Sequence, residues 1–124
     1  QKFAENCISI KNELVALLIK LRNEGKTIGG YAATSKSTTV LNYCGLDSSL
    51  ISFICDSTPE KIGMLTPGSR IPIIAIEEMH LNPPDYLVLF GWNHEKEIRE
   101  KEVKISNAGV KWIKYIPRVE VIDH

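Results

Sequence analysis

The sequence predicts an α/β domain in which helices cover both faces of a mainly parallel, doubly wound sheet. Short apolar runs of β type alternate with helical patterns along residues 8–122. Parallel neighbouring strands need crossover connections, and helices normally supply them. At 124 residues the chain is long enough for a single core and too short for two ordinary domains. We therefore expect one three-layer, Rossmann-like domain over residues 1–124.

The first predicted elements surround a glycine-rich loop. Apolar residues recur at helical spacing over residues 8–21, and Gly25 is typical of a helix end. The segment "KTIGGY" predicts a short strand that enters the loop, and "STTVLNYC" predicts a helix whose N-terminus faces it. The apolar run "LISFIC" (residues 50–55) is typical of a buried parallel strand. Residues 27–56 should therefore form a parallel strand, helix and strand unit.

The second half predicts the remaining strands and one further helix. Pro72 interrupts "GSRIPIIAI", so we expect an edge strand or a loop there. The clearest strand signal is "PDYLVLFGW", and residues 94–108 are charged and favour a helix with a thin apolar stripe. "VKWIKYIP" predicts a last strand, to which "VEVI" adds a short one.

Composition excludes several classes of partner and site. The 15 basic and 15 acidic residues balance, which gives no footprint for nucleic acid or for an anionic membrane surface. The longest apolar run, "LVALLI", is far shorter than a membrane span. The three cysteines lack CxxC spacing and no secretory leader is visible, so we expect a cytoplasmic protein without a zinc site. The start at Gln1, directly before a helical pattern, predicts a segment excised from a longer chain.

The loop from Gly29 to Ser37 is the best candidate for a binding site. Glycines allow close approach, the following helix N-terminus favours an anion, and Ser35, Ser37 and Lys36 add donors and a cation. The spacing matches neither GxGxxG nor GxxxxGK[ST]. A tight structural turn with a solvated Lys36 is the alternative interpretation.

Other polar residues follow predicted strands, at the edge where α/β sheets bind ligands. Asp56 ends the second strand, where dinucleotide folds place an acid on ribose hydroxyls, and Trp92 and Asn93 follow the clearest strand. The alternatives are an acid that caps the following turn and a tryptophan that closes the core.

The remaining reactive side chains have simpler interpretations. We expect the histidines at the surface and Cys44 buried as a small apolar residue without a base. The acidic residues of the 94–108 segment are interpreted as a solvated helix face: Glu95, Glu97, Glu100 and Glu102.

One stretch resembles a known family pattern. "GYAATSKSTTVLNYCGLD" is similar to the GYGAxAKGxTLLNYCGID pattern of the C-terminal domain of S-adenosylmethionine-dependent C-methyltransferases, some of which methylate nucleotide-linked deoxysugars. "DSTPEKIGMLTPGSRIPI", "PPDYLVLFGWN" and "AGVKWIKYIPRVEVI" follow in the family's order. The chain departs from the pattern at Ala32 and Ser37, which replace glycines, and at Ile62, which replaces a glutamine.

The resemblance implies that this domain positions a substrate inside a larger enzyme. Such enzymes carry a cysteine-bearing zinc domain and a central domain that binds S-adenosylmethionine and holds the acid/base residues. This chain would then hold no cofactor, catalytic residue or metal ligand, would be inactive alone, and would bind a nucleotide sugar or a similar anionic small molecule against the missing N-terminal methyltransferase domain. The implied substrate-binding residues are Gly30, Tyr31, Ala32, Ser35, Lys36, Ser37, Asn42, Asp56, Trp92 and Asn93.

Two other functions stay open at this point. A dinucleotide-binding Rossmann domain is favoured by Asp56 and disfavoured by the absent GxGxxG. A structural module that packs on a partner domain without touching a ligand is the other alternative.

Overall fold

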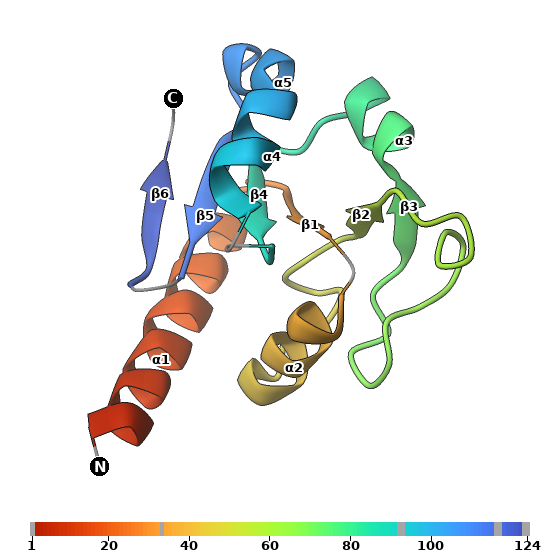
Figure 1. Cartoon of the computed structure of the whole chain (residues 1–124). Helices are drawn as coiled ribbons and strands as arrows, with labels where there is room; N and C mark the ends of the chain where they lie inside the picture. Colours follow the sequence, from red (N-terminus) through yellow and green to blue (C-terminus); the bar gives the residue numbers. More distant parts are fainter. Residues whose placement is uncertain (1, 33, 92–93, 116–117, 123–124) are drawn as a thin grey trace.

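The computed structural model describes residues 2–32, 34–91, 94–115 and 118–122, and their side chains except those of residues 2–6, 35 and 36. Helices and strands alternate along most of this chain (Figure 1). The helices are α1 (Lys2–Asn23), α2 (Ser35–Cys44), α3 (Ile76–Leu81), α4 (Glu95–Lys101) and α5 (Val103–Asn107). The strands are β1 (Ile28–Tyr31), β2 (Ile54–Asp56), β3 (Ile73–Ala75), β4 (Tyr86–Leu89), β5 (Lys111–Lys114) and β6 (Glu120–Ile122).

The strands of the described residues form one six-stranded sheet in the order β3-β2-β1-β4-β5-β6. Neighbours from β3 to β5 are parallel, and β6 pairs antiparallel with β5. The predicted strand, helix and strand unit is confirmed, since Gly30 pairs in parallel with Ile54 across β1 and β2. The edge strand after Pro72 is also confirmed, because β3 lies at the end of the strand order.

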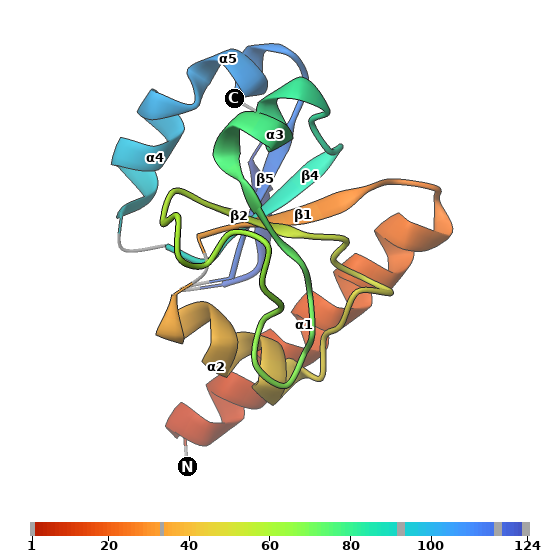
Figure 2. The same ribbon diagram turned by 90° about the vertical axis from the view of Figure 1, so that its right-hand side faces the viewer.

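Helices lie on both sides of this sheet. Figure 2 shows α1 and α2 on one side of the central strands and α3, α4 and α5 on the other. Successive strand side chains alternate between the faces, so Val88 packs in the cluster with Leu14 and Leu18 of α1, whereas Leu87 packs in the cluster with Met79 of α3. The structure is thus an α/β fold with a mostly parallel sheet and an apolar core on each face.

Two elements differ from the sequence-based expectation. A short helix, α3, follows β3 directly, and its N-cap Ala75 supplies no side-chain capping bond, which is why no start signal was visible. The helix expected over residues 94–108 is broken into α4 and α5 at Glu102, which leaves helical geometry with φ −103° and ψ 29°. Among the described residues, no helix combines the length and apolar character that crossing a membrane requires.

Candidate functional site

The N-terminus of α2 is closed by its own side chains. The Thr34 amide donates to Ser37 Oγ at 2.9 Å, and the Ser37 amide donates to Thr34 Oγ1 at 3.3 Å. Ser37 Oγ also donates to the Thr34 carbonyl at 2.7 Å, so this fully buried hydroxyl has partners in both directions. The capping box satisfies these groups reciprocally. Ser37, a predicted ligand residue, is therefore placed as a structural cap.

The backbone amides at the end of β1, just before the loop, donate hydrogen bonds within the sheet. The Gly30 amide donates to the Phe53 carbonyl and the Ala32 amide to the Cys55 carbonyl, each at 2.9 Å. A Cβ on Gly30 would lie 2.6 Å from the Phe90 ring, so protein side chains already fill the space that this glycine leaves. What remains for an anion is the first turn of α2, where helical geometry gives the amides of residues 35 and 36 no partner inside the helix.

Both departures from the family's glycines have local consequences. Ala32 has φ +82°, a conformation that glycine adopts easily and alanine does not. Ser37 replaces the second glycine and supplies the cap described above. The predicted side-chain roles of Ser35 and Lys36 lie outside the described part of the structure, as do Trp92 and Asn93 altogether.

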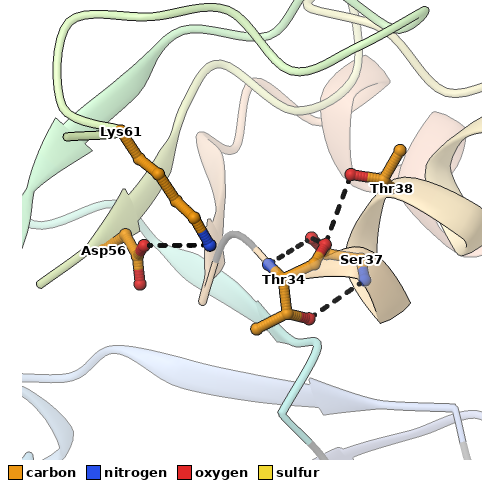
Figure 3. A network of polar contacts seen from close by, with 5 residues as sticks. All are labelled: Thr34, Ser37, Thr38, Asp56 and Lys61. Atoms are coloured by element: carbon orange, nitrogen blue, oxygen red, sulfur yellow. Dashed lines mark hydrogen bonds and ion pairs between the residues drawn. The ribbon is translucent and has the colours of Figure 1, made fainter. Parts of the chain in front are cut away.

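Asp56, at the end of β2, and Lys61, in the loop that follows β2, lie near the start of α2 (Figure 3). Asp56 ends β2, where the sequence placed it, and its side chain is 12% exposed. Lys61 Nζ lies 3.9 Å from Asp56 Oδ2, and this oxygen is buried and accepts no hydrogen bond from the described residues. In Figure 3 the Lys61 amino group lies between Asp56 and Thr34. A buried carboxylate oxygen without a hydrogen-bond donor is costly, and the polar contact that the structure gives it is the ion pair with Lys61.

A cavity of about 280 Å³ opens between α2 and the loop that connects β2 to β3. Its polar lining comes from Thr34, Thr38, Lys61 and Thr66, and its apolar lining from Met64, Leu65, Pro67 and Ile73. Sequence reasoning did not single out Lys61, Met64 or Leu65. The available signal was the run of apolar residues between turn-forming residues in "KIGMLTPG".

Asn42 supports the wall of this cavity. Its Nδ2 donates to the Pro67 carbonyl at 3.3 Å, and a Cβ on Gly68 would lie 2.4 Å from Asn42 Oδ1. Gly68 has φ +79°, a value that already favours glycine there. Asn42, a predicted ligand residue, thus holds α2 against the 61–72 loop.

Tyr31, another predicted ligand residue, points into the opposite core. Its hydroxyl donates to Glu102 Oε2 at 2.5 Å, and Glu102 Oε1 lies 2.6 Å from His80 Nε2. Burial and the neighbouring Glu102 carboxylate raise the pKa of Tyr31 well above its ordinary value. The ring packs edge-on against Trp112 at 5.6 Å between centroids. The structure does not bring this hydroxyl to the cavity.

The interpretation of Glu102 as part of a solvated helix face was wrong. Only 3% of Glu102 is exposed, because the break between α4 and α5 turns it inward to meet Tyr31 and His80. Glu97 and Glu100 are exposed, while Glu95 is half-buried and pairs with Arg99 and Lys114. His80 lies at the surface as expected. Cys44 is only half-buried, which corrects the prediction of a buried residue.

The comparisons with known proteins agree with the resemblance in the sequence. The model of the C-methyltransferase C-terminal domain family matches residues 1–117. The chain belongs to this family. It is 35% identical over 123 residues to the C-methyltransferase NovU of Streptomyces niveus. The match covers 99% of this chain and 29% of NovU, so the chain spans less than a third of that relative.

This C-methyltransferase C-terminal domain shows no clustered metal ligands in its described part. No group of three or more His, Cys, Asp or Glu side chains there is placed to hold a metal ion. The polar groups that converge from separate elements are instead Thr34, Thr38 and Lys61, which line the cavity beside α2, and Asp56, which forms an ion pair with Lys61.

Proposed function

We propose that this chain is the substrate-positioning domain of an S-adenosylmethionine-dependent C-methyltransferase. In this proposal the cavity beside α2 holds the diphosphate end of a nucleotide-linked sugar or a similar anionic substrate. The observation that carries the proposal is the arrangement of Lys61 and the buried Asp56 oxygen opposite the N-terminus of α2. The sheet order β3-β2-β1-β4-β5 and the helices on both faces support a three-layer Rossmann-like classification, in which ligands lie at the carboxyl ends of the strands.

Each group has a distinct part in this proposal. The partial positive charge at the N-terminus of α2 and the Lys61 ammonium attract phosphate oxygens. The Asp56 oxygen accepts a hydrogen bond from a hydroxyl of the substrate, which supplies the hydrogen bond that this oxygen lacks among the described residues. Together these contacts select an anionic group and orient the end of the substrate that carries it.

Positioning of this kind serves carbon methylation. Transfer of a methyl group to carbon needs a carbanion or enolate at the acceptor, held in line with the methyl donor. Contacts to a remote, non-reacting part of the substrate supply orientation for that step. The loop after β1 does not fit S-adenosylmethionine itself, since its amides pair with β2 and ring carbons occupy the space beside Gly30. The same observation removes support from the dinucleotide alternative.

A titration of the isotope-labelled chain tests the proposal. Inorganic pyrophosphate should shift the amide resonances of residues 35 and 36, which have no partner inside the helix, whereas an uncharged nucleoside should shift them far less. Lys61→Gln should weaken pyrophosphate binding by roughly 10- to 150-fold, which corresponds to the about 1.5–3 kcal/mol of a charge-assisted contact. Lys101→Gln, on the exposed end of α4, is the matched control.

Asp56 is tested separately because in this proposal it accepts a hydrogen bond from a substrate hydroxyl and does not contact the anion. Asp56→Asn should weaken binding of a nucleotide sugar and leave pyrophosphate binding unchanged or stronger. Amides that do not respond to pyrophosphate, or a Lys61→Gln variant that binds it normally, would contradict the proposed anion site. Equilibrium dialysis with labelled S-adenosylmethionine should find no saturable binding to this chain; micromolar binding would overturn the assignment.

A further inference from the structure

Another cavity lies between α1 and α2, on the side of the sheet that these two helices cover (Figure 2). Its volume is about 130 Å³. The described lining comes from the first half of α1, from the second half of α2 and from Tyr115, which follows β5. It shares no described lining residue with the cavity at the start of α2, so the two are separate sites.

The walls of this cavity are apolar. Leu14 and Val40 supply hydrocarbon from the two helices. Cys44 is half-buried, and burial raises the pKa of its thiol although the Lys11 cation opposes the shift, so the thiol stays neutral. The Lys11 ammonium lies over the exposed ring of Tyr43, 5.1 Å from its centroid, which holds this charge at the mouth. A charged ligand would lose its hydration inside without gaining a partner.

The Tyr115 hydroxyl is the polar group of the interior. Only 3% of Tyr115 is exposed, and its ring packs against Phe90 at 6.2 Å between centroids. The hydroxyl is buried and has no hydrogen-bond partner among the described residues. Burial and the neighbouring Cys44 raise the pKa of Tyr115 well above its ordinary value, so the hydroxyl keeps its proton. A buried hydroxyl without a partner is costly, and a ligand oxygen beside it would remove that cost.

The volume limits the ligand to one small ring. An apolar protein cavity of about 150 Å³ binds benzene, so a cavity of about 130 Å³ suits a ring of similar size whose edge reaches the mouth. A rigid ring also loses little conformational freedom when it binds.

We propose that this cavity binds a small neutral ring that carries one hydroxyl group, with Tyr115 as its hydrogen-bond partner and Leu14 and Val40 as its apolar walls. Because neighbouring atoms cover the Tyr115 hydroxyl, the ligand reaches it when the small Cys44 side chain changes rotamer. The proposal goes beyond the anion site at the start of α2, and neither site requires the other.

Phenol and toluene test the proposal on the 124-residue chain, since they have the same size and differ in a hydroxyl against a methyl group. NMR titration followed at the methyl groups of Leu14 and Val40 gives both dissociation constants. Phenol should bind about threefold to tenfold more tightly than toluene. Tyr115→Phe removes one oxygen and should reverse this order, because the phenol hydroxyl then has no partner in the cavity. Tyr86→Phe, outside the cavity lining, is the matched control and should keep the order of the parent chain.

A second pair of variants locates the ligand. Val40→Phe fills the space between the helices and should weaken binding of both compounds at least tenfold, measured at Leu14. Val121→Phe, at a position of β6 that is 42% exposed, should change neither affinity. In the parent chain, intermolecular NOEs should join the ring protons of phenol to the methyl groups of Leu14 and Val40.

Three results would overturn the inference. If phenol causes no saturable shift at Leu14 and Val40, the cavity does not bind such a ring. If toluene binds as tightly as phenol, or if Tyr115→Phe leaves their order unchanged, the hydroxyl does not select the ligand. Binding that persists in Val40→Phe would place the ligand elsewhere on the chain.

Discussion

The same substitution at two buried tyrosines should change stability in opposite directions. Tyr31 is 4% exposed and Tyr115 is 3% exposed, and they belong to the cores on opposite faces of the sheet. The Tyr31 hydroxyl donates to Glu102 at 2.5 Å, whereas the Tyr115 hydroxyl has no hydrogen-bond partner among the described residues. Replacement by phenylalanine removes one oxygen in each case and leaves the ring.

The expected magnitudes follow from these partners. A hydrogen bond to a charged group contributes about 1.5–3 kcal/mol, so Tyr31→Phe should lower the free energy of unfolding by about 2 kcal/mol. An unsatisfied buried hydroxyl costs about 1–3 kcal/mol, so Tyr115→Phe should raise the free energy of unfolding by about 1 kcal/mol. The two variants should thus differ by about 3 kcal/mol.

Urea denaturation followed by circular dichroism measures this difference. With a slope of about 1.5 kcal/mol per molar urea, the midpoints of the two variants should lie about 2 M apart, on either side of the parent chain. Glu102→Gln provides a coupling test: in the Tyr31→Phe background it should cost less than in the parent chain, because a buried neutral amide tolerates the missing donor better.

Equal shifts of the midpoint in the same direction for both phenylalanine variants would contradict these assignments of the two hydroxyls. Strictly additive effects of Tyr31→Phe and Glu102→Gln would also contradict them, since the hydroxyl and the carboxylate would then not act as a pair.

Further predictions concern the loop glycines, the cap and pH. Ala32→Gly should raise the free energy of unfolding by up to about 1 kcal/mol, because φ +82° strains alanine; a loss of stability would contradict this. Ser37→Gly should lower it by about 1–2 kcal/mol through loss of the cap, measured by urea denaturation. Gly30→Ala should lower it by about 1–3 kcal/mol, since its Cβ would meet the Phe90 ring; an unchanged midpoint would refute the clash. Burial raises the pKa of Cys55 from 9.0 to about 12, so the unfolded chain loses this proton first and stability should fall as pH rises above 9. The decline should steepen above pH 10, where the two tyrosines of raised pKa contribute, and a flat profile from pH 8 to 11 would be inconsistent with these shifts.

The sequence by itself determined the order of most elements and the position of Asp56. Apolar runs and turn residues mark β1, β2 and β4, and the need for crossovers makes their pairing parallel. Pro72 marks the edge strand because proline cannot donate to a sheet. Asp56 then falls at the carboxyl end of β2, as local pattern and strand topology require. The element positions follow from interactions between residues close in sequence, and the parallel pairing follows from the crossover connections that those elements require.

Only the tertiary structure decided which polar residues face a ligand and which face the core. Tyr31 belongs to the loop pattern, yet its partner Glu102 lies 71 positions away, and no local periodicity connects them. The sequence predicts a solvated Glu102 because its neighbours are charged. In the structure Glu102 is buried because α4 ends just before it and α5 begins just after it. Lys61, Met64 and Leu65 line the cavity because the 61–73 loop packs against α2, and the sequence pattern does not show this packing. The physical reason is that burial and partner choice depend on contacts between distant segments, which helical and strand periodicity do not specify.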